Sequence, residues 1–191
     1  MAYPYFEGED FSDTLRPVKE LAGCLIEAAE YSDLTVEMGR FIASSCGYYM
    51  SRVCDMKESY DNNWCILDGG INHMNYIGQM IGMKTPVMIT LKNNHKGLEK
   101  AIKNNKKQHI TQTLCGSLCT TNDIMVRSYN GDMLSIGDVI VFCNIGAYSI
   151  TEGLNLFLSR NMPVVLIHRN GIISKVRNCL ETWQLNSESK I

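Results

Sequence analysis

The sequence has 191 residues, of which 45% are hydrophobic and 20% charged, and its formal net charge is -2. This length suffices for one domain, or for one domain and a fragment of another, and no apolar run approaches the ~20 residues that span a bilayer. The densest basic cluster, residues 100–107, is short and rich in asparagine, which argues against nucleic-acid binding, and the N-terminus lacks the features of a secretory signal, so we expect a cytoplasmic protein.

The first 50 residues have the pattern of an α/β unit. Apolar residues at helical spacing predict a helix over residues 12–30, with Ser12 or Asp13 as its cap. A short apolar strand, Leu34 to Val36, and a second helix from Phe41 to about Tyr49 follow. Because a parallel strand has no partner in this stretch, we interpret it as the last unit of a larger α/β structure.

From residue 48 onward the pattern changes to short strands separated by glycine and asparagine turns, such as residues 61–63, 130–132 and 170–171. A series of short strands separated by such turns is typical of a β-sandwich or a β-barrel. We therefore divide the chain into residues 1–46, the α/β remnant, and residues 47–191, the β domain. The predicted strands are residues 50–57, 64–67, 87–91, 109–114, 123–126, 138–142 and 164–168.

Eight cysteines are scattered along the chain without a Cys-x-x-Cys pair or a histidine at ligand spacing, so we predict neither a metal site nor a disulfide framework. We expect reduced and mostly buried thiols. Cys119 is the exception, because it follows Gly116 and precedes the polar run to Asp123, and a loop cysteine of this kind is more accessible than the other seven. Its reactivity depends on a lowered pKa, which no sequence pattern reveals.

Three further positions could carry chemistry, and each also has a purely structural interpretation. Gly39 and Arg40 lie where a strand leads into a helix and could bind a phosphate, with Glu37 beside them, or could form a helix cap or a surface ion pair. Tyr148 follows a glycine bend and could present its hydroxyl or simply be packed. His73 lies in a loop after a strand, where an isolated histidine is more often structural.

Taken in chain order, several motifs of this sequence resemble those of the C-terminal half of fold-type-III decarboxylases, the diaminopimelate/ornithine decarboxylase family related to alanine racemase. The resemblance runs from about Asp10 to Trp183. It implies a mainly β fold, with a Greek-key-like C-terminal β-barrel preceded by the last helix and strand unit of a truncated β/α barrel. The motifs that carry it are Glu37-Met38-Gly39-Arg40, Asp68-Gly69-Gly70, Cys115-Gly116-Ser117-Leu118-Cys119 with Asp123, Gly137-Asp138 and Gly146-Ala147-Tyr148.

The resemblance also implies pyridoxal 5'-phosphate as the cofactor and assigns roles to the motif residues. Glu37 would pair with the pyridine nitrogen, and Gly39, Arg40 and Tyr148 would bind the phosphate. Cys119 would act at the cofactor of the neighbouring subunit, protonating the carbon that has lost carbon dioxide. The substrate-binding residues would be His73, Thr120 and Asp123.

Several features of the family have no counterpart in these residues: the Schiff-base lysine, the ring-stacking histidine and a phosphate-binding glycine run. We therefore expect the chain to be inactive alone and to work as a homodimer or with a complementing N-terminal barrel chain. Residues 72–76 and Thr120 depart from the diaminopimelate pattern and are closer to relatives that act on other amino acids, some of them linked to carrier proteins. The alternative is a non-catalytic binding or dimerisation module derived from such an enzyme.

Overall fold

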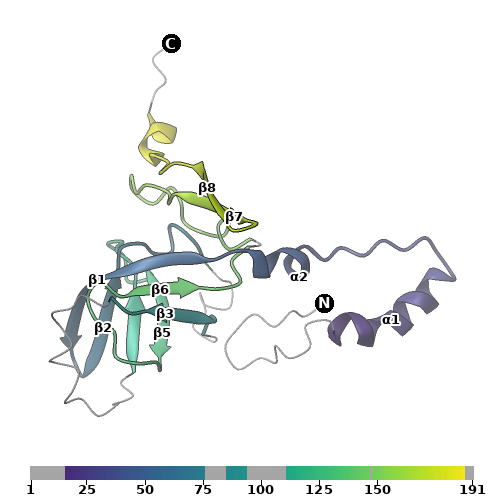
Figure 1. The fold of residues 1–191 in the computed structure, drawn as a ribbon, viewed down its shortest axis with the longest axis horizontal. Coiled ribbons are helices and arrows are strands. Elements are labelled where there is room, and N and C mark those ends of the chain that lie inside the picture. The colour runs from purple at the N-terminus through teal and green to yellow at the C-terminus, as the bar shows by residue number, and fades with distance from the viewer. Residues whose placement is uncertain (1–15, 76–84, 94–110, 147, 188–191) are drawn as a thin grey trace.

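The computed structural model describes residues 16–75, 85–93, 111–146 and 148–187. Its N-terminal part contains helix α1 (Arg16–Ala29), helix α2 (Gly39–Ala43) and the 3-10 helix η1 (Ser44–Cys46). Figure 1 shows α1 standing away from the sheet at the end of an extended segment, and α1 packs against no other described helix or strand. The helix predicted over residues 12–30 is confirmed from Arg16 on, whereas its predicted caps, Ser12 and Asp13, lie outside the described residues.

The predicted strand from Leu34 to Val36 is wrong. Residues 33–38 form no regular structure, and the side chains of Leu34 and Val36 are each 45% exposed. The apolar, β-branched pattern suits a parallel strand, but such a strand exists only when a neighbouring backbone accepts and donates its hydrogen bonds. Among the described residues no strand lies beside this segment.

The second predicted helix, residues 41–49, is also placed incorrectly. Helix α2 begins at Gly39, the helical turns end at Cys46, and Tyr49 already belongs to a strand. The Ser44 carbonyl accepts hydrogen bonds from the N–H groups of Gly47, at 3.4 Å, and Gly146, at 3.0 Å. A segment distant in sequence therefore occupies the group that a continuing helix would use, which explains the early end.

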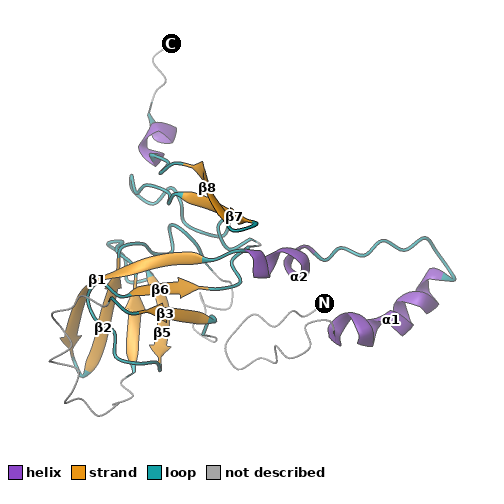
Figure 2. Ribbon diagram, viewed as in Figure 1, coloured by secondary structure: helices purple, strands orange, loops and turns teal. Residues whose placement is uncertain are grey.

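One curled six-stranded sheet forms the body of the molecule (Figure 2). The strand order is β3-β6-β1-β2-β4-β5, and all neighbours are antiparallel except β2 and β4. This half-barrel confirms the prediction of a mainly β fold. Its strands are β1 (Tyr49–Ser59), β2 (Asn62–Leu67), β3 (Met88–Leu91), β4 (Gln112–Cys115), β5 (Ile124–Tyr129) and β6 (Val139–Phe142).

Side chains close the half-barrel where its backbone does not. The edge strands β3 and β5 are joined by a hydrogen bond of 2.9 Å between the hydroxyls of Thr90 and Tyr129. In the first half of β1, alternate residues face the core, as the period of two requires: Tyr49 and Val53 are buried while Met50 is exposed. The core contains Tyr49, Val53, Cys65, Leu67, Ile71, Met74, Leu114, Leu118, Met125, Val126, Tyr129, Leu134, Ile140, Phe142 and Ile145.

A separate hairpin, β7 (Val165–Arg169) and β8 (Ile172–Arg177), rises from the sheet toward the C-terminal end (Figure 1). Its two-residue turn has positive φ at both Asn170 and Gly171, 51° and 79°, the combination that matches strand twist. Strand β8 is not among the sequence predictions. The hairpin exposes at least half of each of five aliphatic side chains, Leu166, Ile167, Ile172, Ile173 and Val176.

The other strand predictions are confirmed with shifted ends. The largest shift is in β5, which continues three residues beyond the predicted end at Val126. Residues 109 and 110 of the predicted fourth strand lie outside the described residues. Within the described part of the chain, no helix has the length and hydropathy needed to cross a membrane.

Candidate functional site

The residues that follow α2 are held against the segment that follows β6. Two backbone hydrogen bonds join these segments: Gly146 N–H donates to the Ser44 carbonyl at 3.0 Å, and Ile145 N–H donates to the Gly47 carbonyl at 3.1 Å. A Cβ atom at Gly146 would collide with the Ala43 carbonyl oxygen. Only glycine permits this approach, which explains the glycine of the Gly-Ala-Tyr motif and fixes where Tyr148 can reach.

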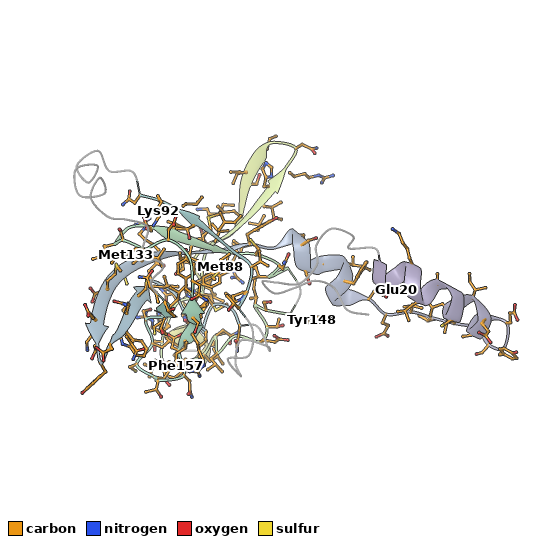
Figure 3. All side chains as sticks on the ribbon, turned by 90° about the horizontal axis from the view of Figure 1, so that it is seen from below. Glu20, Met88, Lys92, Met133, Tyr148 and Phe157 are labelled. Atoms are coloured by element: carbon orange, nitrogen blue, oxygen red, sulfur yellow. The ribbon has the colours of Figure 1, made fainter. Side chains whose placement is uncertain are left out.

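The side chain of Tyr148 brings a phenol group to the start of α2. Its hydroxyl lies so close to Gly39 that a Cβ atom there would overlap it, and the side chain is 52% exposed. Its φ of 63° is unusual for an aromatic residue, and strain of this kind persists where the surroundings require it. The Tyr148 carbonyl accepts hydrogen bonds from Glu152 N–H and Thr151 Oγ1, both at 2.8 Å. Figure 3 shows Tyr148 on the side of the sheet from which α2 emerges.

The other two predicted cofactor residues lie in the same stretch of chain. Arg40 is the second residue of α2, so its backbone is part of the helix start. Glu37 is exposed in the extended segment that leads into α2. The structure thus brings Gly39, the backbone of Arg40 and Tyr148 together and leaves Glu37 two residues away along the chain.

Asp123 occupies a different place, at the junction of two loops. Its side chain is 2% exposed, and its two carboxylate oxygens accept hydrogen bonds from Ile71 N–H at 2.9 Å and Leu118 N–H at 2.8 Å. A Cβ atom at Gly70 or Gly116 would collide with this carboxylate. The carboxylate therefore ties the loop after β2 to the loop after β4 and faces inward.

His73 is held at both ring nitrogens. Nε2 lies 2.8 Å from the Asn161 carbonyl, so it carries the proton and donates, and Nδ1 accepts from the Tyr49 hydroxyl at 2.7 Å. Burial lowers the pKa of His73 and raises that of Tyr49. His73 therefore acts as a neutral imidazole that bridges β1 and residue 161, which is the structural role expected for an isolated histidine.

The loop that carries Cys119 runs between Gly116 and Asp123. Cys119 is exposed, and Thr120 accepts hydrogen bonds within the turn, from Asp123 N–H to its carbonyl at 3.2 Å and from Asn122 N–H to its Oγ1 at 3.3 Å. Ser117 accepts a hydrogen bond from Arg160 Nη2. The loop is therefore ordered by local turns, by Asp123 at its end and by an arginine from a distant segment.

The prediction of mostly buried thiols is wrong. Only Cys65 and Cys143 are buried, and Cys115 is intermediate; burial raises the pKa of Cys65 to about 12 and that of Cys115 to about 11. Accessibility also fails to single out Cys119. The exposed thiols lie on α1, at the end of η1, on the outer face of β1, in the loop and after the hairpin, and they are Cys24, Cys46, Cys54, Cys119 and Cys179.

One segment, residues 148–161, connects the two groups of candidate residues. It starts at Tyr148 and contacts the loop after β2 through Asn75 N–H to the Ser149 carbonyl and Leu154 N–H to the Ile71 carbonyl, both 2.8 Å. Through Arg160 it reaches the Cys119 loop. Sequence reasoning missed this connection, because the segment has neither helical nor strand periodicity. Within the described ranges, no group of three or more histidine, cysteine or acidic residues is arranged to hold a metal ion.

Comparison with known proteins identifies the family. Residues 40–146 match the model of the family described as "Pyridoxal-dependent decarboxylase, C-terminal sheet domain". The chain is 26% identical over 180 residues to diaminopimelate decarboxylase of Methanocaldococcus jannaschii, covering 90% of this chain and 37% of the relative. It is 33% identical over 141 residues to 2-[(L-alanin-3-ylcarbamoyl)methyl]-2-hydroxybutanedioate decarboxylase of Staphylococcus aureus, covering 73% and 34%.

The fold agrees with this match. A crystal structure of the M. jannaschii diaminopimelate decarboxylase superimposes with a TM-score of 0.76 at 18% identity, covering 100% of this chain and 41% of that one. The chain thus spans well under half the length of these relatives. The half-barrel, the motif order and the matched family model together show that the chain belongs to the pyridoxal-dependent decarboxylases and carries their C-terminal sheet domain.

Proposed function

We propose that this chain supplies the sheet domain of a pyridoxal-phosphate-dependent amino-acid decarboxylase and holds the phosphate group of the cofactor. The observation that carries the proposal is the Tyr148 hydroxyl lying against Gly39 at the start of α2, on a backbone with φ of 63°. A phenolic O–H, backbone N–H groups and an arginine suit a phosphate dianion. Gly39 has no side chain to block its approach.

The residues present therefore fit the cofactor that the family implies. Gly39, Arg40 and Tyr148 would bind the phosphate, and Glu37 would accept a hydrogen bond from the protonated pyridine nitrogen. When bound, pyridoxal phosphate supplies a conjugated ring that takes up the electron pair left when the carbon–carboxylate bond breaks. The protein must then deliver one proton to that carbon.

We assign this proton delivery to Cys119, whose exposed loop would face the substrate across a subunit or domain boundary. Thr120, next in the chain, would contact the substrate. Asp123 and His73 are better described as positioning residues than as substrate ligands, because their polar atoms are engaged with Ile71, Leu118, Tyr49 and Asn161.

The substrate is an amino acid, and we propose that it carries a further carboxylate, since both relatives are named as decarboxylases of such compounds. Residues 1–46 would be the last unit of the cofactor-binding barrel and residues 47–191 the sheet domain. A homodimer or a complementing barrel chain would complete the site, with a cytoplasmic location as for other amino-acid metabolism.

An NMR titration of the isotopically labelled chain tests the phosphate site. Pyridoxal phosphate should shift the backbone amide signals of Gly39 and Arg40, and pyridoxal, which lacks the phosphate, should not. The substitution Tyr148→Phe should weaken the response by removing one donor, worth roughly 0.5–1.5 kcal/mol or a factor of about 2 to 12 in affinity. Equal shifts with both compounds, or no effect of Tyr148→Phe, would contradict the proposal.

A further inference from the structure

Arg160 is held rigidly although it lies in an irregular segment. Its carbonyl accepts a hydrogen bond of 2.8 Å from the hydroxyl of Thr182, a residue only 1% exposed. The carbonyl of the next residue, Asn161, accepts from His73 Nε2 at 2.8 Å. The backbone is thus fixed from two sides, by η2 (Thr182–Asn186) and by the loop after β2, so the direction of the Arg160 side chain is restricted.

The guanidinium of Arg160 reaches the loop that carries Cys119. Its Nη2 donates to Ser117 Oγ, whose hydroxyl in turn donates to the Asp68 carbonyl at 3.5 Å. The residue is exposed, and among the described residues its guanidinium donates to Ser117 alone. A guanidinium has five N–H groups, so four are not used in this contact.

The acidic groups in this neighbourhood are engaged elsewhere. Asp123 accepts from two backbone N–H groups. Asp68 Oδ1 accepts from Ser51 Oγ at 2.7 Å and Arg52 N–H at 2.8 Å. The positive charge of Arg160 is close enough to His73 to lower its pKa, after the larger effect of burial and against the opposing effects of Asp68 and Asp123.

We propose that Arg160 binds a carboxylate group of the substrate, one that is not removed in the reaction. This inference rests on the proposed function, because it takes the Cys119 loop to face the substrate. A planar guanidinium binds a carboxylate through two parallel hydrogen bonds. The fixed backbone and the contact with Ser117 place the guanidinium at the loop that carries Cys119, so Arg160 selects substrates with a second anionic group.

The contact of Arg160 with Ser117 brings its positive charge to within two residues of Cys119 along the chain. Ser117 and Cys119 are two residues apart, so their Cα atoms are separated by at most about 7 Å. This is within the screening length of roughly 8 Å at physiological ionic strength. At a separation of this order in a water-like dielectric with physiological salt, one positive charge favours the approach of a monoanion by about 1.5-fold.

Two alkylating reagents of similar size test the inference in this chain alone. Iodoacetate carries a carboxylate and iodoacetamide is neutral, and both attack the same thiolate. The ratio of their rates at Cys119, measured by mass-spectrometric peptide mapping, therefore reports anion attraction and cancels the thiolate fraction. Arg160→Gln should lower this ratio about 1.5-fold or more, and Arg160→Lys should largely keep it. Arg169→Gln, an equal charge change at the end of β7, is the matched control and should leave the ratio unchanged.

Two results would overturn the inference: an equal fall in the Arg169→Gln control, or an unchanged ratio in Arg160→Gln, including the case in which both reagent rates change equally. This last case would mean that Arg160 only shapes the loop. Circular dichroism spectra of all variants identify any misfolded protein. If Arg160→Gln does not fold, the test rests on the wild-type ratio, which should fall as added salt screens the charge of Arg160 and would contradict the inference if it did not. The outcome is independent of the NMR titration with pyridoxal phosphate, so failure of this inference and failure of the proposed function are distinguishable.

Discussion

Replacing Asp123 should destabilise the sheet domain more than any conservative change on its surface. The carboxylate is 2% exposed and accepts one backbone N–H from each of two loops, those of Ile71 and Leu118. Asp123→Asn keeps the shape but replaces one acceptor oxygen with a donor NH2. One of the two N–H groups then faces a donor and is left unsatisfied in the interior.

The expected cost follows from the local packing. Each buried N–H without an acceptor costs about 1–3 kcal/mol, so Asp123→Asn should cost about 1–3 kcal/mol and Asp123→Ala about 2–6 kcal/mol. In Asp123→Asn water cannot easily substitute, because the side chain lies directly against Gly70 and Gly116 without room even for a Cβ atom. Against a total stability of about 5–15 kcal/mol, the alanine variant should be close to unfolding.

Urea denaturation measures this effect. With a denaturant dependence of about 2 kcal/mol/M, a loss of 2 kcal/mol lowers the midpoint by about 1 M. Asp132→Asn removes the same charge from an exposed position and should change stability by less than about 0.5 kcal/mol. If Asp123→Asn proved as stable as the Asp132→Asn control, the carboxylate would not be the link between the two loops, and the assignment of Asp123 as a positioning residue would be wrong.

Three further predictions concern other contacts. Burial lowers the pKa of His73 below its ordinary value of 6.5, so the unfolded chain binds more protons than the folded one as the pH falls. The free energy of unfolding should therefore be intact above about pH 6.5 and fall as the pH drops toward the folded pKa. His73→Gln should flatten this dependence in thermal melts at several pH values. Tyr129→Phe removes the hydroxyl that bonds Thr90 across the barrel opening and should cost about 0.5–1.5 kcal/mol in urea denaturation, with faster amide exchange in β3; unchanged exchange would argue against closure by this pair. Gly146→Ala should cost about 1–3 kcal/mol, because its methyl group would collide with the backbone facing it, and should abolish the Gly39 NMR response by displacing Tyr148.

The strands of the half-barrel were predictable because their signals are local. Alternation of buried and exposed residues in the first half of β1, and the continuous apolar run Val139-Ile140-Val141-Phe142 of β6, are local signals of strands. The missed strand β8 also has a local signal, since Asn170-Gly171 between two β-rich runs is a strong hairpin pattern. The parallel pairing of β2 with β4 has none. The 44 residues between Leu67 and Gln112 contain no periodic pattern that fixes where the chain returns.

The two incorrect predictions near the N-terminus, the strand from Leu34 to Val36 and the helix over residues 41–49, have one physical origin. Leu34 to Val36 has the composition of a buried parallel strand, and its side chains are nearly half exposed because no described backbone lies beside it. The second helix ends early because Gly146 takes the Ser44 carbonyl. In both cases tertiary context decides whether local propensity is realised. A strand without a neighbour stays unformed, and a helix whose acceptor is taken terminates.

The candidate site, like the fold, was predictable from the sequence only in part. Motif order predicted that Gly39, Arg40 and Tyr148 serve a common purpose, and the packing of Gly146 against Ala43 supplies the mechanism that brings them together. Motif order gave no indication that Asp123 faces inward, because a motif specifies residue type and spacing but not the side of the loop to which a carboxylate turns. It also gave no weight to Arg160, which lies in no motif. That residue acquires a role only because Thr182 and His73 fix its backbone beside Ser117. Residues that act through such long-range contacts leave no pattern in the sequence, so their discovery requires the fold.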